Sequence, residues 1–190
     1  MFLGRPDRNL ILTGYIGPNQ PVIGQTVAQQ LKMRFVNIEV LLETRGDMDI
    51  DDMRARYGET RLKMLETEVM QEVLLHRGAV IQVSGQTLLR TETTARVQAN
   101  GLVLCLVVRL DAALQRMHLA LGGRYHNPSE RALAIGHLKS EWAVRKSSGV
   151  HELDVTNLHE AEMIEKVCSF WEQAQTGLLI NRAAPPANGV

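Results

Sequence analysis

Short apolar runs alternate with helix-like stretches along most of this 190-residue chain. Runs of Val, Ile and Leu without polar alternation are typical of strands that are buried on both faces of a parallel sheet. The five runs are Leu10–Thr13, Phe35–Asn37, Ala79–Val83, Leu102–Val108 and Glu152–Val155. Helical patterns are expected over 22–32, 38–45, 50–57, 59–76, 91–99, 111–120, 130–146 and 159–176. The alternation predicts a three-layer α/β domain with right-handed crossovers around a five-stranded parallel sheet.

The length favours one domain, which we expect to span residues 1–178. A glycine-rich loop signal between two helices predicts a small mobile lid at about 121–131. The last residues, 179–190, are rich in proline and alanine and are expected to form a flexible tail.

The first apolar run leads into a glycine turn and then into a helix, which is the frame of a Walker A nucleotide site, G-x-x-x-x-G-K-[ST]. Gly14 supplies the first glycine, but Asn19, Gln20 and Pro21 stand at the second glycine, the lysine and the Ser/Thr. Gln20 cannot neutralise phosphate charge, and Pro21 has no hydroxyl for Mg²⁺. Pro18 and Pro21 also lack the backbone N–H groups that cradle phosphates. An alternative stays open, in which the segment is a plain strand–turn–helix with Pro21 in the favoured first helical turn.

Composition excludes several functions. Lys+Arg and Asp+Glu both number 21, so generic nucleic-acid binding is not expected, and no apolar run is long enough to span a membrane. The two cysteines do not suggest a disulfide framework, and a cytoplasmic location is expected. The six histidines lack the spacing of a zinc site, so no metal is predicted. Charge is uneven: residues 37–72 hold ten acidic and five basic side chains, a pattern typical of solvated surface or of a partner surface.

Over about residues 9–170 the chain resembles the shikimate kinase family. The similarity rests on Gly14-Tyr15-Ile16-Gly17, on Gly24, on Leu31 through Val36, on Gly46 through Ile50, on Gly58-Glu59 with Leu65-Glu66, and on Asn100 through Val103. The resemblance implies a nucleoside-monophosphate-kinase-like fold, with a shikimate subdomain at about 38–76. It also implies transfer of the γ-phosphate of MgATP to the 3-hydroxyl of shikimate.

Several positions depart from the family's chemistry. Where the family has two aspartates, for Mg²⁺ and for shikimate hydroxyls, this chain has Asn37 and Glu39. The shikimate-carboxylate arginine falls at Lys63, which keeps the charge but loses the bidentate fork. A triple-glycine turn falls at Ser84-Gly85-Gln86. A lid arginine is retained as Arg124, and a second substrate arginine aligns best with Trp142.

The changes fall on both the nucleotide site and the substrate site, so two hypotheses follow. The first is a non-catalytic shikimate-kinase-like protein that has no cofactor and acts by binding a ligand, an unknown protein partner or a second copy of itself. Its altered sites make ATP and shikimate binding doubtful. The alternative is an active small-molecule kinase with a non-standard site, in which Lys63 or Arg124 supplies positive charge to the phosphate.

Overall fold

The computed structural model describes residues 7–122 and 127–176. Five strands form one parallel sheet in the order β2-β3-β1-β4-β5. The strands are β1 (Asn9–Gly14), β2 (Arg34–Asn37), β3 (Ala79–Gln82), β4 (Gly101–Val107) and β5 (Val150–Asp154). The predicted fold class is therefore confirmed, because each apolar run forms a strand within two residues of its expected bounds.

The helices follow the strands in alternation. They are α1 (Gln20–Gln30), α2 (Ile38–Gly46), α3 (Ile50–Val73), α4 (Gly85–Arg90), α5 (Thr94–Asn100), α6 (Leu110–Leu121), α7 (Pro128–Trp142) and α8 (Glu160–Gln175), with a 3₁₀ turn at Ala143–Lys146. No helix in the described ranges is long and apolar enough to cross a membrane. The predicted tail, and Arg124 in the predicted lid, lie outside the described residues.

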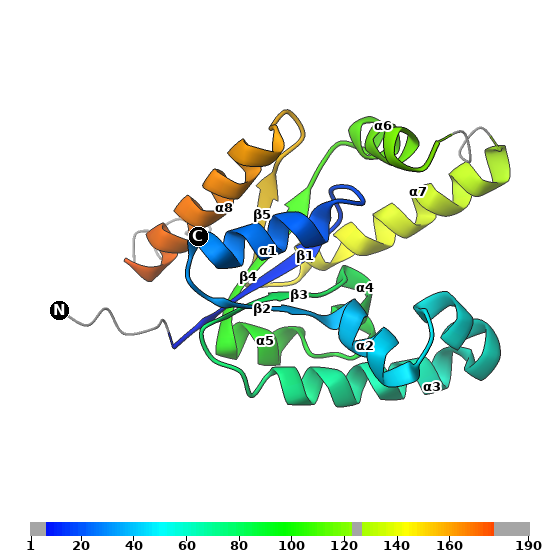
Figure 1. The fold of residues 1–190 in the computed structure, drawn as a ribbon, viewed down its shortest axis with the longest axis horizontal. Coiled ribbons are helices and arrows are strands. Elements are labelled where there is room, and N and C mark those ends of the chain that lie inside the picture. The colour runs from blue at the N-terminus through cyan, green and yellow to red at the C-terminus, as the bar shows by residue number, and fades with distance from the viewer. Residues whose placement is uncertain (1–6, 123–126, 177–190) are drawn as a thin grey trace, which may run out of the picture.

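The sheet is covered on both faces (Figure 1). Helices α1 and α8 pack against each other on one face, while α4 and α5 lie on the other face with α3 beyond them. The central strands β1 and β4 are buried along their whole length, which their continuous apolar sequences require. Burial of this core, rather than contacts in any loop, stabilises the domain.

Two local differences from the predicted elements bear on the site. The two helices expected at 50–57 and 59–76 are both present within α3 and are separated, as expected, by a kink at Gly58, which is non-helical with φ of 77°, although the second ends earlier, at Val73. A positive φ is readily adopted only by glycine, so Gly58 lets the chain turn between the two halves. The sequence does not predict helix α4, because Ser84-Gly85-Gln86 falls where the family has a glycine turn. Instead Ser84 caps this helix by accepting a hydrogen bond from the Thr87 backbone N–H.

Candidate functional site

A cavity of about 310 Å³ opens at the carboxyl ends of β1 and β3. The chain leaves β1 toward β2 on one side and leaves β3 toward β4 on the other side. A crevice therefore opens between the ends of β1 and β3, which is the usual ligand site of such folds. We call this the main cavity. Its lining residues are Gly14, Tyr15, Gly17, Pro18, Gln20, Pro21, Asn37, Glu39, Gln82, Val83, Ser84, His137 and Glu141.

The glycine loop forms one wall of the main cavity, and the side chain of Gln20 lies inside the loop. The Gln20 side chain is only 6% exposed. Its Oε1 accepts a hydrogen bond from the Ile16 backbone N–H at 3.0 Å, and its Nε2 donates to the Gly14 carbonyl at 3.0 Å. A side chain of the protein therefore occupies a backbone donor of the loop that would otherwise be available to a phosphate.

Other side chains tie the same loop to distant elements. Arg116 of α6 donates to the Ile16 carbonyl at 3.0 Å, and the Trp142 indole N–H donates to the Tyr15 carbonyl at 2.9 Å. Asn19 donates to the Glu160 carboxylate at 2.8 Å, which links the loop to the first turn of α8. The loop is thus held at several points by the protein's own polar groups. Trp142, aligned with a substrate arginine, serves here as one of these anchors and is 8% exposed.

Gly14 is the one loop glycine that packing demands. Its φ is +84°, and a Cβ built on it would lie 2.3 Å from the Leu106 carbonyl oxygen of β4. No larger residue fits there without displacing the central strand. The first glycine of the expected motif therefore serves the strand-to-loop turn, whatever the loop binds.

The opposite wall is built from the ends of β2 and β3. Asn37 ends β2 and caps α2 by accepting a hydrogen bond from the Glu39 backbone N–H at 3.0 Å. Glu39 reaches the main cavity from the first turn of α2. Partial desolvation raises the pKa of Glu39, and the Glu43 carboxylate one turn further on raises it again. Both residues that stand in place of the family's aspartates therefore line the cavity, one neutral and one carboxylic.

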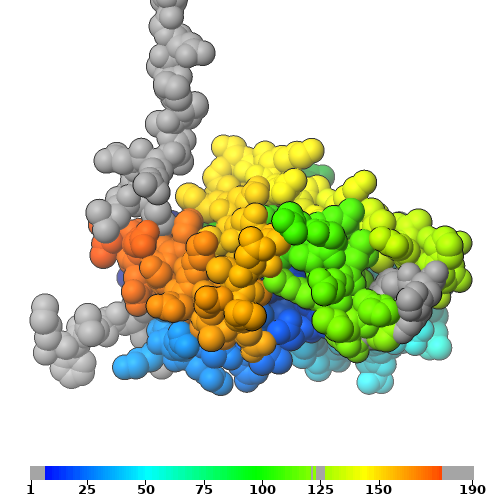
Figure 2. All heavy atoms as spheres, turned by 90° about the horizontal axis from the view of Figure 1, so that it is seen from above, coloured from blue at the N-terminus to red at the C-terminus, as the bar shows by residue number. Residues whose placement is uncertain are grey.

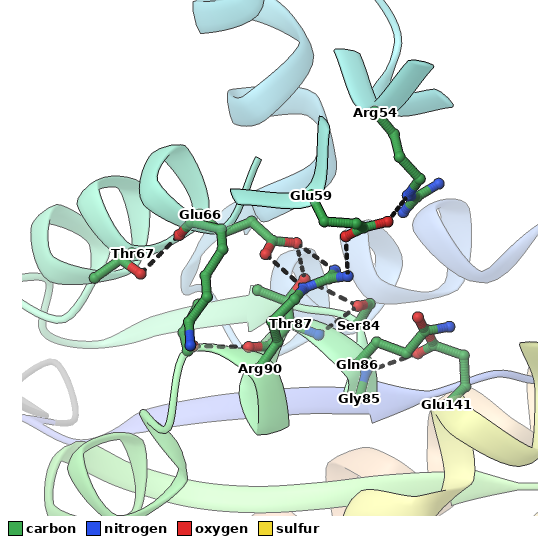
Figure 3. Close-up of polar contacts among 12 residues, drawn as sticks. Arg54, Glu59, Glu66, Thr67, Ser84, Gly85, Gln86, Thr87, Arg90 and Glu141 are labelled. Carbon is green, nitrogen blue, oxygen red and sulfur yellow. Dashed lines mark hydrogen bonds and ion pairs between the residues drawn. The ribbon is translucent and has the colours of Figure 1, made fainter. Parts of the chain in front are cut away.

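Glu141 brings a second carboxyl group into the cavity from α7. It is 4% exposed, and its Oε2 accepts a hydrogen bond from the Gly85 backbone N–H at 2.7 Å (Figure 3). Burial raises the pKa of Glu141 to about 7, and the charge of Glu39 adds to the effect, although the hydrogen bonds from Gly85 and Gln86 oppose it. The nearest histidine ring nitrogen, Nε2 of His137, lies 3.9 Å away. Burial lowers the pKa of His137, so this ring is a weak counter-ion.

Close packing also explains why Gly85 persists where the family's triple glycine falls. A Cβ on Gly85 would lie 2.0 Å from the Glu141 carbonyl oxygen. The neighbouring Ser84 and Gln86 have room for side chains, and Gln86 Nε2 lies 3.0 Å from the His137 ring Nδ1. Glycine is therefore required at position 85 because the backbone of α7 lies against it.

A wider acidic cleft of about 420 Å³ continues from the main cavity toward α3. Its ionisable lining residues are Glu39, Glu43, Asp49, Asp51, Asp52, Arg54, Glu66, Arg90, His137 and Glu141. Both arginines are already paired: Arg54 contacts Asp51 and Glu59, and Arg90 contacts Glu59 and Glu66. Figure 3 shows the Arg90 guanidinium between the two glutamates. The cleft therefore has excess negative charge.

The Glu66–Arg90 pair is the most buried of these contacts. Glu66 is 1% exposed, and its carboxylate accepts from Arg90 Nε at 2.8 Å, from Arg90 Nη2 at 2.7 Å and from the Thr87 hydroxyl at 2.9 Å. This bidentate geometry fixes α4 against α3 and engages Arg90 with the protein's own carboxylates. Lys63, aligned with the carboxylate-binding arginine, lies on the exposed side of α3 and lines neither the main cavity nor the acidic cleft.

A second cavity, of about 620 Å³, lies across the glycine loop between α6 and the start of α8. Figure 2 shows these two elements side by side on one face of the molecule. Arg116 lines this cavity, but its guanidinium is also bound to the Val155 and Thr156 carbonyls at 3.3 and 3.0 Å. Leu158, Met163 and Leu119 supply apolar surface around it.

Sequence reasoning identified the loop and the β2 end of the site, but not Glu141, Gln82, His137 or Arg116. These four come from segments with no local motif. The pairing of β3 with β1 places Gln82 beside the loop, and the packing of α6 and α7 on the sheet brings the other three there. No group of three or more metal-binding side chains occurs among the residues that the structure describes.

The parallel strand order, with a glycine loop between β1 and α1, defines the αβα P-loop kinase fold. The profile of the shikimate kinase family matches residues 21–172, and the chain belongs to that family. A shikimate kinase of Thermodesulfovibrio yellowstonii is 24% identical over 178 residues, which cover 90% of this chain and 98% of that relative.

Solved structures agree on the fold. Shikimate kinase from Bacteroides thetaiotaomicron matches with a TM-score of 0.70 and 18% identity, covering 90% of this chain and 98% of that one. Shikimate kinase from Acinetobacter baumannii in complex with shikimate matches with a TM-score of 0.64 and 17% identity, covering 95% and 97%.

The predicted family is thus confirmed. These similarities carry no sign of a lost activity, and of our two hypotheses they favour the kinase. The family profile begins to match at Pro21, so Gly14 through Gln20 lie outside the matched range.

Proposed function

We propose that this protein is a shikimate kinase family member that binds a small molecule at the carboxyl end of its sheet and does not transfer phosphate from MgATP. The observation that carries the proposal is the hydrogen bonding of Gln20 to Ile16 and Gly14 within the loop. A residue that replaces the phosphate-binding lysine also takes up one of the loop's N–H donors. The loop is therefore closed on itself rather than open to a triphosphate.

The charge of the site supports the same proposal. Phosphoryl transfer depends on cations that stabilise the charge on the transferring group. No lysine or arginine of the described residues lines the main cavity, whereas the carboxyl groups of Glu39 and Glu141 do. The residues present do not fit Mg²⁺ coordinated in the family's manner, because Pro21 has no hydroxyl and Asn37 is neutral.

A second candidate function is ATP-dependent phosphorylation of a small-molecule hydroxyl. The observation that favours it is the extent of the similarity, which spans 98% of the Thermodesulfovibrio relative and includes an intact cleft. In this case the positive charge would have to come from outside the described lining of the main cavity, from Lys63 or from Arg124 of the predicted lid.

Isothermal titration of the purified chain with MgATP, ADP and shikimate separates the two. The proposal expects no heat from any of the three at millimolar concentration. Micromolar affinity for MgATP, with turnover in a coupled assay, would establish the kinase instead. Binding of a protein partner or of a second copy remains part of the non-catalytic hypothesis, as does a cytoplasmic location. Both described cysteines are free, which suits a reducing compartment.

A further inference from the structure

We propose that the main cavity binds a small hydroxylated ammonium compound, such as an amino sugar or an amino alcohol. The inference rests on the proposed function, since it names the ligand of a cleft that binds a small molecule without MgATP. It reverses the ligand charge that the family resemblance implies, because the described walls of this cavity offer acceptors and negative charge in place of cations.

The first argument is the balance of donors and acceptors in the main cavity. Glu39 and Glu141 enter from α2 and α7 and both line this cavity, and the charge of Glu39 helps to raise the pKa of Glu141. Neither has a lysine or arginine partner among the described contacts. A carboxylate accepts hydrogen bonds and an ammonium group only donates them. A cationic amine placed between the two would therefore meet the need of both.

The second argument is independent of these carboxyl groups. Gln82, the last residue of β3, lines the same cavity and is only 6% exposed. Its Oε1 has no hydrogen-bond partner within the described structure. Buried amide oxygens are rarely left unpaired, because each one forgoes the hydrogen bond it had in water. This oxygen lies against Gly24 of α1, where an added Cβ would approach it to 2.6 Å. Because the terminal torsion of glutamine is soft, rotation of the amide would turn the oxygen toward a donor in the cavity.

The third argument concerns size and the neutral part of the ligand. At about 310 Å³ the cavity has room for about ten water molecules at liquid density, which is the scale of a compact sugar or a short polyol. Asn37 and Ser84 line it with an amide and a hydroxyl, which can donate to and accept from ligand hydroxyls. Their capping bonds to α2 and α4 leave the amide N–H groups of Asn37 and one lone pair of the Ser84 hydroxyl for the hydroxyls of a ligand.

The experiment uses two matched sets of probes that differ only in the charge of one group. The first set is glucosamine, glucose and glucuronate, and the second is ethanolamine, ethylene glycol and glycolate. Each is titrated into the full-length protein by calorimetry at pH 7, up to about 20 mM, in a buffer without amines. Ligands of this size reach a dissociation constant of about 1 mM from ordinary contacts. We expect the amine of at least one set to bind, and its anion to give no signal.

Two substitutions test where the amine binds. Glu39→Gln and Glu141→Gln keep side-chain size but remove one charge each, and each is expected to weaken amine binding on the order of tenfold or more. Glu165→Gln, an exposed position on α8 away from both cavities, is the matched control and should leave binding unchanged. A folded circular-dichroism spectrum and a cooperative melt are required of every variant.

Each result has a definite meaning. Absence of binding by both amines, stronger binding of an anion, or amine binding that neither variant weakens would overturn the proposal. MgATP titrated into the same sample reports separately on the proposed function. If both the amine and MgATP bind, the proposal that the protein does not use MgATP is wrong and the amine proposal stands. If neither binds, the amine proposal is wrong and the proposal about MgATP stands.

Discussion

Gln20 Oε1 accepts the backbone N–H of Ile16 at 3.0 Å, four residues earlier in the chain and inside the glycine loop. Through this bond one side chain occupies a backbone N–H from which a bound anion could accept in a phosphate loop, and the bond from Gln20 Nε2 to the Gly14 carbonyl holds that side chain in place. The loop thus has an internal partner for the Ile16 N–H and the Gly14 carbonyl.

Replacing Gln20 should therefore destabilise the protein in the absence of any ligand. Gln20→Ala leaves the Ile16 N–H and the Gly14 carbonyl without their partner, at a cost of about 1–3 kcal/mol. For a domain of this length, the melting temperature falls by roughly 2–4 °C for each kcal/mol. Gln25→Ala, an exposed glutamine of the same helix, is the control and should melt like the parent in a thermal scan.

Restoring the lysine alone should not restore nucleotide binding. Gln20→Lys returns the charge, but Pro18 and Pro21 still withhold two backbone N–H groups and the Mg²⁺ hydroxyl is still missing. The combined change Pro18→Ser, Asn19→Gly, Gln20→Lys and Pro21→Ser is expected to produce measurable MgATP binding by calorimetry. Tight MgATP binding by the single variant would show that the prolines are not the obstacle.

Glu141 should make stability depend on pH. Its pKa rises from the ordinary value near 4.5 to about 7 in the folded chain, so the folded state binds this proton more tightly than the unfolded state. The resulting stability is fully present below pH 4.5 and is lost as the pH rises through 7, and it amounts to roughly 3 kcal/mol. Urea unfolding at pH 5 and pH 8 measures this effect. The free energy of unfolding of Glu141→Gln, relative to that of the parent, should be higher at pH 8 than at pH 5.

For Glu165→Gln, the free energy of unfolding relative to the parent should be the same at both pH values, because this side chain is exposed on α8. If the Glu141→Gln difference were equal at both pH values, Glu141 would not be the carboxyl group that titrates near neutrality.

Burial distinguishes two arginine–glutamate pairs that look alike in sequence. Arg90→Ala leaves Glu66, which is 1% exposed, without its cation, and should cost about 3 kcal/mol because an uncompensated charge stays buried. Arg45→Ala breaks the contact with Glu72 on the surface, where solvent screens both charges, and should leave the melting temperature nearly unchanged. Equal effects of the two substitutions would contradict the structural role given to Arg90.

The sheet could be predicted from sequence because each strand is a continuous apolar run bounded by turns. Burial on both faces leaves no other place for Leu10–Leu12 or for Leu102–Val107. The helices were harder at their ends. Helix α4 escaped prediction because its sequence, Ser84-Gly85-Gln86-Thr87, has the composition of a turn, and only its packing on α7 and on the 3₁₀ turn makes it a helix.

The site was predictable only as far as its local motif extended. Gln20 could be identified as a lysine replacement, but its bonds depend on the loop path that the left-handed Gly14 creates. Glu141 carries no signal in sequence, since a lone glutamate on an amphipathic helix is usually solvated. Lys63 illustrates the converse, because alignment gives its place in the chain but not the exposed direction of its side chain.

The central claim is that the loop does not hold a triphosphate, and a thermal shift with millimolar MgATP tests it most directly. A ligand present at 100 times its dissociation constant would add about 2.7 kcal/mol of stability, which is a rise of several degrees in a domain of this size. We predict cooperative unfolding without nucleotide and no shift on adding MgATP. A rise of several degrees would contradict the account and show that the loop of Gln20 binds nucleotide.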